Sequence, residues 1–150
     1  MNYVPSTVVV LDTSVVLKWF RQGEVGAEKA LALRAAYLDG ALGIAVPDLL
    51  LYELGNVLRY KPDFDSNKVT AAVESVLAMG LSWHAVTQDR LVRAVEIAFT
   101  HDVTVYDAAF VALAENLQAD FVTADEQLAH RLLGVEKVYT LREVIPPRAA

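Results

Sequence analysis

Short runs of consecutive apolar residues alternate along this chain with longer segments in which apolar residues recur every three or four positions. The first run, residues 8–11 (Val-Val-Val-Leu), is apolar throughout, which is typical of a parallel strand covered on both faces. We expect further strands at 44–46, 103–105, 121–123 and 137–139, and an extended segment at 81–86. Helical periodicity and capping residues predict helices at 13–19, 24–38, 47–60, 65–80, 88–100, 107–117 and 125–133.

This alternation of strands and helices predicts an α/β fold with helices layered around a parallel sheet. The 150 residues fit one domain spanning 1–150, because no linker, charge run, low-complexity tract or internal repeat divides them. The N-terminus lacks the pattern of a signal peptide, and the longest apolar run, 108–114, is too short to span a membrane. The absence of cysteine excludes disulfides and thiolate zinc sites, so we expect a cytoplasmic protein.

The composition adds two constraints on partners. Hydrophobic residues make up 55% of the chain, which indicates apolar surface reserved for a partner or a second copy. The net charge of −6 is unusual for a nucleic-acid binder, because phosphate contacts come mainly from Lys and Arg. A metal ion held by carboxylates would reverse the local field, so the overall charge does not exclude nucleic acid.

Four acidic residues each lie at the edge of an apolar segment: Asp12, Glu53, Asp107 and Asp125. A buried ionised carboxylate is costly unless it is paired or holds a metal. Several carboxylates packed together also raise each other's pKa unless a cation compensates them. Because Mg²⁺ and Mn²⁺ prefer oxygen ligands and commonly join a few carboxylates to a substrate phosphate, the four acids predict metal-dependent phosphodiester chemistry.

Each acid also has an ordinary structural interpretation. Asp12, Asp107 and Asp125 each lie where a helix is expected to begin, so each could simply cap that helix. Glu53 could be an ordinary residue at the boundary between core and solvent. Its spacing from Asn56, three positions later on one helix, would let both oxygens face one spot. The functional interpretation therefore depends on the four acids meeting in space.

The motifs at 9–14, 47–58, 104–109 and 121–125, in this order, resemble those of PIN-domain nucleases, and in particular VapC-type ribonuclease toxins. The resemblance implies a three-layer α/β/α sandwich with a central parallel sheet. It also implies a metal-dependent endoribonuclease that hydrolyses RNA with Mg²⁺ or Mn²⁺. A homodimer and a small antitoxin, whose tail blocks the pocket, are the partners it implies.

The same resemblance assigns roles to residues. Asp12, Glu53, Asp107 and Asp125 match the catalytic, metal-binding acids of the family. Polar residues at neighbouring positions match those that support the site: Ser14, Asn56 and Thr123. The RNA target, the number of metal ions, the choice between Mg²⁺ and Mn²⁺, the antitoxin class and the dimer geometry do not follow from the sequence.

Other functions fit the residues less well. A haloacid-dehalogenase-like phosphatase also has an Asp after its first strand, but it requires a second Asp where this chain has Ser14. A non-catalytic PIN-fold module with an RNA-binding or regulatory role is a further alternative. The intact set of four acids argues against it. No glycine-rich fingerprint for a dinucleotide follows any expected strand.

Candidate contact surfaces can also be named. Four basic residues could bind the RNA backbone, although each could equally be a solvated surface charge: Lys18, Arg21, Arg90 and Arg93. Trp19, Phe20 and the helices between residues 47 and 80 could form a partner surface, with core packing as the alternative for most of their apolar residues.

Overall fold

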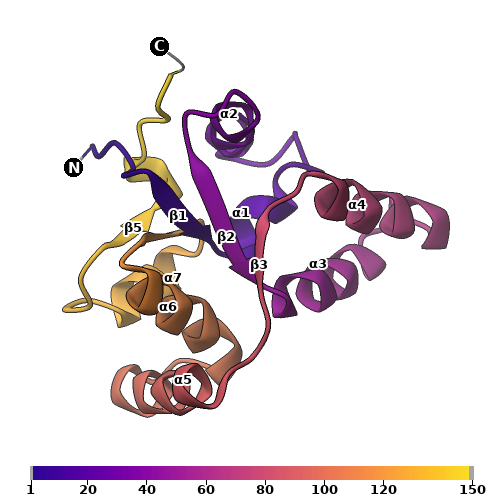
Figure 1. The fold of residues 1–150 in the computed structure, drawn as a ribbon. Helices are drawn as coiled ribbons and strands as arrows, with labels where there is room; N and C mark the ends of the chain where they lie inside the picture. The colour runs from indigo at the N-terminus through magenta and orange to yellow at the C-terminus, as the bar shows by residue number, and fades with distance from the viewer. Residues whose placement is uncertain (1, 149–150) are drawn as a thin grey trace.

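The protein, described over residues 2–148 by a computed structural model, is built on one sheet of five strands (Figure 1). The strand order is β3-β2-β1-β4-β5, and every neighbouring pair is parallel. The strands are β1 (Val8–Leu11), β2 (Gly43–Pro47), β3 (Ser82–His84), β4 (Asp120–Thr123) and β5 (Val138–Thr140). The predicted parallel sheet is therefore confirmed.

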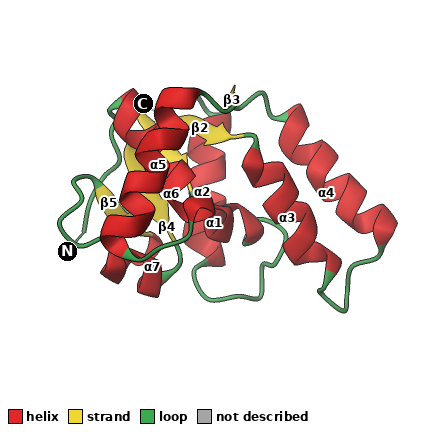
Figure 2. Ribbon diagram, turned by 90° about the horizontal axis from the view of Figure 1, so that it is seen from below, coloured by secondary structure: helices red, strands yellow, loops and turns green. Residues whose placement is uncertain are grey.

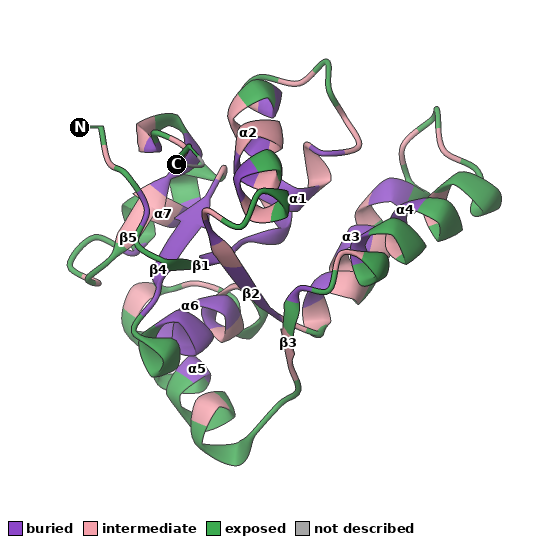
Figure 3. Ribbon diagram, turned by 45° about the horizontal axis from the view of Figure 1, so that its top comes forward, coloured by how far each residue is buried: buried purple, intermediate pink, exposed green. Residues whose placement is uncertain are grey.

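Helices cover both faces of this sheet (Figures 1 and 2). They are α1 (Thr13–Leu17), α2 (Ala27–Leu38), α3 (Leu49–Arg59), α4 (Ser66–Ala78), α5 (Gln88–His101), α6 (Val105–Leu117) and α7 (Glu126–Arg131), with a 3₁₀ turn at Leu141–Glu143. Helix α6 packs on β1, β2 and β4 and carries α5 on its outer side, whereas α1 and α2 lie across the sheet from them (Figure 3). No single described helix has the length and hydropathy to cross a membrane; α5 and α6 pass that test only as a pair bent by 118°.

The central elements are apolar because both of their sides are buried. Residues Val9–Leu11 of β1 have no exposed surface, and all four residues of β4 are buried. Helix α6 is almost entirely apolar for the same reason, since it lies between the sheet and α5. Its largest buried side chain is Phe110.

The predicted strand at 103–105 is wrong. Asp102 adopts a left-handed conformation (φ 54°), and the Val103 amide donates to the carbonyl oxygen of Ala98, which ends α5. Thr104 then caps α6 by accepting a hydrogen bond from the Asp107 amide at 3.0 Å. The chain therefore turns directly from one helix into the next, and Asp107 lies in the first turn of α6 instead of following a strand.

Two predicted helix starts also shift. The helix expected from residue 24 begins at Ala27, because Gly26 takes a left-handed conformation (φ 84°) immediately before it. Pro47 was expected to open a helix, but it is the last residue of β2, and α3 begins at Leu49.

One buried acid belongs to the fold and not to the candidate site. Asp120 opens β4 at the end of the sheet opposite Asp12. Its Oδ2 accepts hydrogen bonds from the Tyr3 hydroxyl at 2.8 Å and from the Ser6 amide and hydroxyl at 2.9 Å each. The Tyr3 ring also stacks on Tyr139. These contacts satisfy Asp120 and hold the N-terminal segment against the sheet.

Candidate active site

The four predicted acids come from four elements at the carboxyl edge of the sheet. Asp12 follows β1, and Asp125 follows β4 by two residues. Glu53 comes from α3 and Asp107 from the first turn of α6. Their charges act on one another: those of Asp12 and Asp107 raise the pKa of Glu53, and those of Asp12 and Asp125 raise the pKa of Asp107. The fold therefore brings the four carboxylates into one electrostatic neighbourhood.

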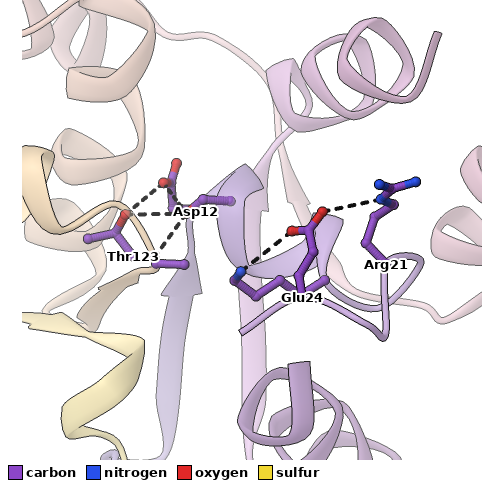
Figure 4. A network of polar contacts seen from close by, with 7 residues as sticks. Asp12, Arg21, Glu24 and Thr123 are labelled. Carbon is purple, nitrogen blue, oxygen red and sulfur yellow. Dashed lines mark hydrogen bonds and ion pairs between the residues drawn. The ribbon is translucent and has the colours of Figure 1, made fainter. Parts of the chain in front are cut away.

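Asp12 lies at the centre of this neighbourhood and is 5% exposed. It occupies the N-cap position of α1, yet its side chain makes no capping hydrogen bond. Its Oδ2 instead accepts hydrogen bonds from the Ser14 hydroxyl at 2.6 Å and the Thr123 hydroxyl at 2.8 Å (Figure 4). Burial is the main cause of the raised pKa of Asp12; the two hydroxyls and the Thr13 amide oppose that rise, and the Asp125 charge adds to it. The capping explanation for Asp12 is therefore wrong.

The two hydroxyls that hold Asp12 also join two turns of the chain. The Ser14 hydroxyl accepts a hydrogen bond from the Ala124 amide at 2.9 Å, and the Thr123 hydroxyl accepts one from the Asp125 amide at 3.0 Å. Because each hydroxyl accepts from an amide, its own proton is free to point at Asp12. The turn after β1 is thus fixed against the turn after β4, with one carboxylate oxygen between them.

Glu53 is positioned by a residue that the sequence analysis did not assign to the site. The Thr13 hydroxyl donates to Glu53 Oε1 at 2.7 Å, and Thr13 is itself buried. Burial is the main cause of the raised pKa of Glu53, and the Thr13 hydrogen bond opposes it. The only sequence signal for this role was a hydroxyl directly after Asp12, which is equally typical of a helix cap.

Asp107 and Asp125 differ in whether their side chains cap a helix. The α6 helix is capped by Thr104, so the half-buried Asp107 carboxylate caps nothing, and burial is the main cause of its raised pKa. Asp125 does cap a helix, because its Oδ1 accepts a hydrogen bond from the Leu128 amide at 3.0 Å. Its second oxygen remains available to the site.

Asn56 is placed differently from the other predicted polar residues. Its side chain is exposed and lines a hollow of about 790 Å³ between α3 and α4. Within residues 2–148 it makes no hydrogen bond to any of the four acids. Its supporting role stays a prediction.

The chemistry of these side chains fits a hard divalent cation. No lysine, arginine or histidine in the described part of the chain pairs with any of the four acids. The available donors are carboxylate and hydroxyl oxygens, which Mg²⁺ and Mn²⁺ prefer. As the side chains stand, however, no three acids or histidines among residues 2–148 are close enough to hold an ion. Binding a cation would therefore require side-chain rotation at the less buried acids.

Three of the four candidate RNA-binding cations are already paired with acids. Lys18 and Arg21 both pair with Glu24, at 3.6 and 3.2 Å (Figure 4), and Arg21 also reaches Asp63. Arg93 pairs with Glu115 at 2.8 Å and with Glu96 at 3.2 Å. Over residues 2–148, Arg90 is the member of this set without an ion pair, and its guanidinium donates to the carbonyl oxygen of Ala85.

The raised pKa of Asp12 has a consequence for stability that can be measured without metal. The folded state holds the Asp12 proton more tightly than the unfolded chain, whose aspartate pKa is near 3.8. The resulting stabilisation is complete below that value and is lost as the pH rises through the higher folded pKa. In the metal-free protein, Asp12→Asn should therefore melt above wild type at pH 8, with the gap narrowing as the pH falls towards the unfolded-chain pKa of 3.8.

Thermal unfolding in EDTA across this pH range measures that gap. Asp39→Asn, at the exposed end of α2, is the matched control and should follow wild type. A difference in melting temperature that did not change with pH would mean that folding does not raise the pKa of Asp12.

Comparisons with known proteins identify the family of this chain. The PIN domain family model matches residues 9–131. Ribonuclease VapC3 from Pyrobaculum aerophilum is 36% identical over 91 residues, which cover 56% of this chain and 67% of that protein.

Two solved structures share the fold at low sequence identity. The Mycobacterium tuberculosis toxin VapC20, described as cleaving the sarcin-ricin loop, has a TM-score of 0.66 and 19% identity, covering 81% of this chain and 93% of its own. A toxin–antitoxin complex from Klebsiella pneumoniae contains a chain with a TM-score of 0.63 and 18% identity, covering 89% of this chain and 97% of its own. The chain therefore belongs to the PIN-domain family, with VapC-type ribonucleases among its relatives.

Proposed function

We propose that this protein is a Mg²⁺- or Mn²⁺-dependent endoribonuclease and the toxin of a toxin–antitoxin pair. The observation that carries the proposal is the state of Asp12: a buried carboxylate that caps no helix, pairs with no basic side chain of residues 2–148 and lies among three other acids. Such an arrangement costs stability in the metal-free protein and becomes favourable when a cation binds. The names of the relatives, a ribonuclease and a toxin, support the same function.

In this proposal the four acids have different roles in metal binding. Asp12 and Asp107 are the principal metal ligands, and Glu53 and Asp125 complete the shell directly or through water. The bound cation would lower the pKa of water and offset charge on the scissile phosphate. Ser14 and Thr123 hold one oxygen of Asp12, which leaves its other oxygen for the ion. Thr13 gives Glu53 a fixed starting position in the same way.

Membership of the PIN-domain family removes the reason to consider a haloacid-dehalogenase-like phosphatase. A non-catalytic RNA-binding or regulatory module remains the alternative proposal. Such a module would have no use for four carboxylates that raise each other's pKa, since neutral side chains would make the fold more stable. The acids therefore favour the enzyme.

Removing the metal tests the enzyme directly. We expect purified protein to cleave single-stranded RNA with Mg²⁺ or Mn²⁺. Cleavage should stop when EDTA is in excess, because without the cation the negative carboxylates repel the RNA phosphate. Adding back Mn²⁺ should restore cleavage. Electrophoresis of end-labelled RNA measures both steps, and cleavage that persists in EDTA would contradict the metal-dependent mechanism.

The proposed partners are a second copy of the chain and a small antitoxin. On α5, the exposed side chains of Val95 and Phe99, four residues apart, form an apolar patch that a second copy could cover. The hollow between α3 and α4 is a candidate seat for an antitoxin segment. Trp19, considered earlier as a partner residue, is 3% exposed, and its indole donates to the Ala30 carbonyl at 2.9 Å, so it belongs to the core. We place the complex in the cytoplasm, where its RNA substrate is found.

The toxin role can be tested in growing cells. Expression of the wild-type chain alone should arrest growth, and co-expression of the small protein encoded beside it should restore growth. Asp12→Asn, expressed to the same level, should have no effect, because toxicity depends on cleavage. Normal growth with confirmed wild-type protein in the cytoplasm would contradict the toxin role without contradicting the nuclease chemistry.

A further inference from the structure

We propose that an apolar cavity beside the four acids binds one nucleobase of the RNA, next to the phosphate that is cut; this inference rests on the proposed ribonuclease function. The cavity lies between the N-terminal parts of α3, α5 and α6 and has a volume of about 320 Å³. That volume falls within the range of about 300–1,000 Å³ that is usual for ligand pockets. Apolar side chains form its walls: Leu49, Leu91, Ala94, Ala109 and Leu113.

The cavity and the acids occupy neighbouring faces of the same two helices. Tyr52 of α3 lines the cavity and directly precedes Glu53, and Tyr106 of α6 lines it and directly precedes Asp107. Consecutive helix residues point about 100° apart, so at both places a tyrosine and an acid lie on adjacent faces. Residues of both helices line the same cavity, so the two helices face each other at this level. A nucleotide whose phosphate reaches the acids would therefore have its base beside the tyrosines.

The rim has the chemistry that binds an unstacked base. Tyr52 and Tyr106 are 80% and 63% exposed, so both rings at the rim are open to a ligand. Proteins that bind single-stranded RNA stack bases on such rings and contact base edges with polar groups. Asp48 and His84 also line the cavity and can supply those polar contacts.

Charge at the rim suits an adjoining phosphate as well. Arg90 lines the cavity and, within residues 2–148, forms no ion pair with a carboxylate. Burial and the Arg90 charge lower the pKa of His84, which keeps its imidazole neutral and able to accept a hydrogen bond at neutral pH. Arg90 thus places a positive charge beside an otherwise acidic site. An apolar side chain of a second copy or of an antitoxin would make no use of Asp48, His84 or Arg90.

Binding of two RNA probes tests this inference. One probe is a single-stranded RNA 12-mer of mixed sequence, and the other is an abasic 12-mer with the same sugar–phosphate backbone. Fluorescence anisotropy with Mg²⁺ would measure both in the Asp12→Asn background, which the mechanism predicts will not cut them. We expect Tyr106→Ala to weaken binding of the normal probe about tenfold and to leave the abasic probe almost unchanged. Tyr52→Ala should act in the same direction, although Tyr52 also borders the hollow between α3 and α4.

Tyr60→Ala provides the matched control. Tyr60 is 75% exposed and follows α3, outside the cavity lining, so its loss should change neither probe. Equal effects of Tyr106→Ala and Tyr60→Ala would overturn the subsite. A Tyr106→Ala protein that bound RNA normally but changed its oligomeric state in sedimentation would also overturn it, in favour of a second copy. Failure of the ribonuclease is distinguishable: wild type would then cut no RNA, whereas a base-dependent loss of binding in Tyr106→Ala would still support the subsite.

Discussion

Replacing Asp12 by asparagine should lower the rate of metal-dependent RNA cleavage by about a thousandfold, equivalent to about 4 kcal/mol of transition-state stabilisation. Asparagine keeps the shape of the side chain and can still accept the hydrogen bonds from Ser14 and Thr123. It removes the negative charge that would bind the cation at the centre of the site. No lysine, arginine or histidine of the described chain pairs with Asp12, so its charge is free to bind the cation.

Single-turnover cleavage of a labelled RNA at saturating Mn²⁺ measures this loss. Asp39→Asn makes the same chemical change at the exposed end of α2 and should cleave at the wild-type rate. Thermal unfolding of both variants shows whether any loss reflects unfolding, and the pKa argument predicts that Asp12→Asn is at least as stable as wild type without metal. A folded Asp12→Asn protein with full activity would remove Asp12 from the mechanism.

The sheet was predictable because burial on both faces makes a strand apolar at every position. Residues 8–11 and 121–123 satisfied that rule and form neighbouring central strands. The same rule failed at 103–105, where Val103 and Val105 are β-branched but no strand forms. Asp102 can adopt a left-handed conformation, and Thr104 can cap a helix, so local hydrogen bonds turn the chain directly into α6. Apolar character alone does not distinguish a short strand from a tight link between two helices.

The acids of the site were predictable as a set, but their individual duties were not. Asp12 and Asp125 both follow strands and both lie at helix starts, yet only Asp125 caps its helix. The difference depends on partners more than a hundred residues away, since Thr123 of β4 draws the Asp12 carboxylate into the site. Thr13 is similar: its bond to Glu53 joins residues 40 positions apart, and a hydroxyl directly after Asp12 is equally typical of a helix cap.

The Thr123 hydroxyl contacts three parts of the site, so we expect its loss to affect metal-dependent cleavage although the side chain is small and buried. It donates to Asp12 Oδ2 at 2.8 Å, accepts from the Asp125 amide at 3.0 Å and lies 3.3 Å from the Ser14 hydroxyl. Valine has nearly the same shape but offers none of these contacts. Asp12 would then lose a hydrogen bond that stabilises its ionised form, and its proton would compete more strongly with a cation.

We therefore expect Thr123→Val to raise the Mg²⁺ concentration needed for half-maximal cleavage by about 10- to 100-fold, the usual effect of removing a hydrogen bond to a metal ligand. Because proton competition causes the loss, it should shrink as the pH is raised, which a merely structural defect would not do. Thr140→Val is the matched control: Thr140 lies beside Thr123 on β5, is also buried, and within the described residues its hydroxyl makes no hydrogen bond to any of the four acids. Equal Mg²⁺ requirements for the two variants would show that Thr123 supports the sheet and not the Asp12 carboxylate.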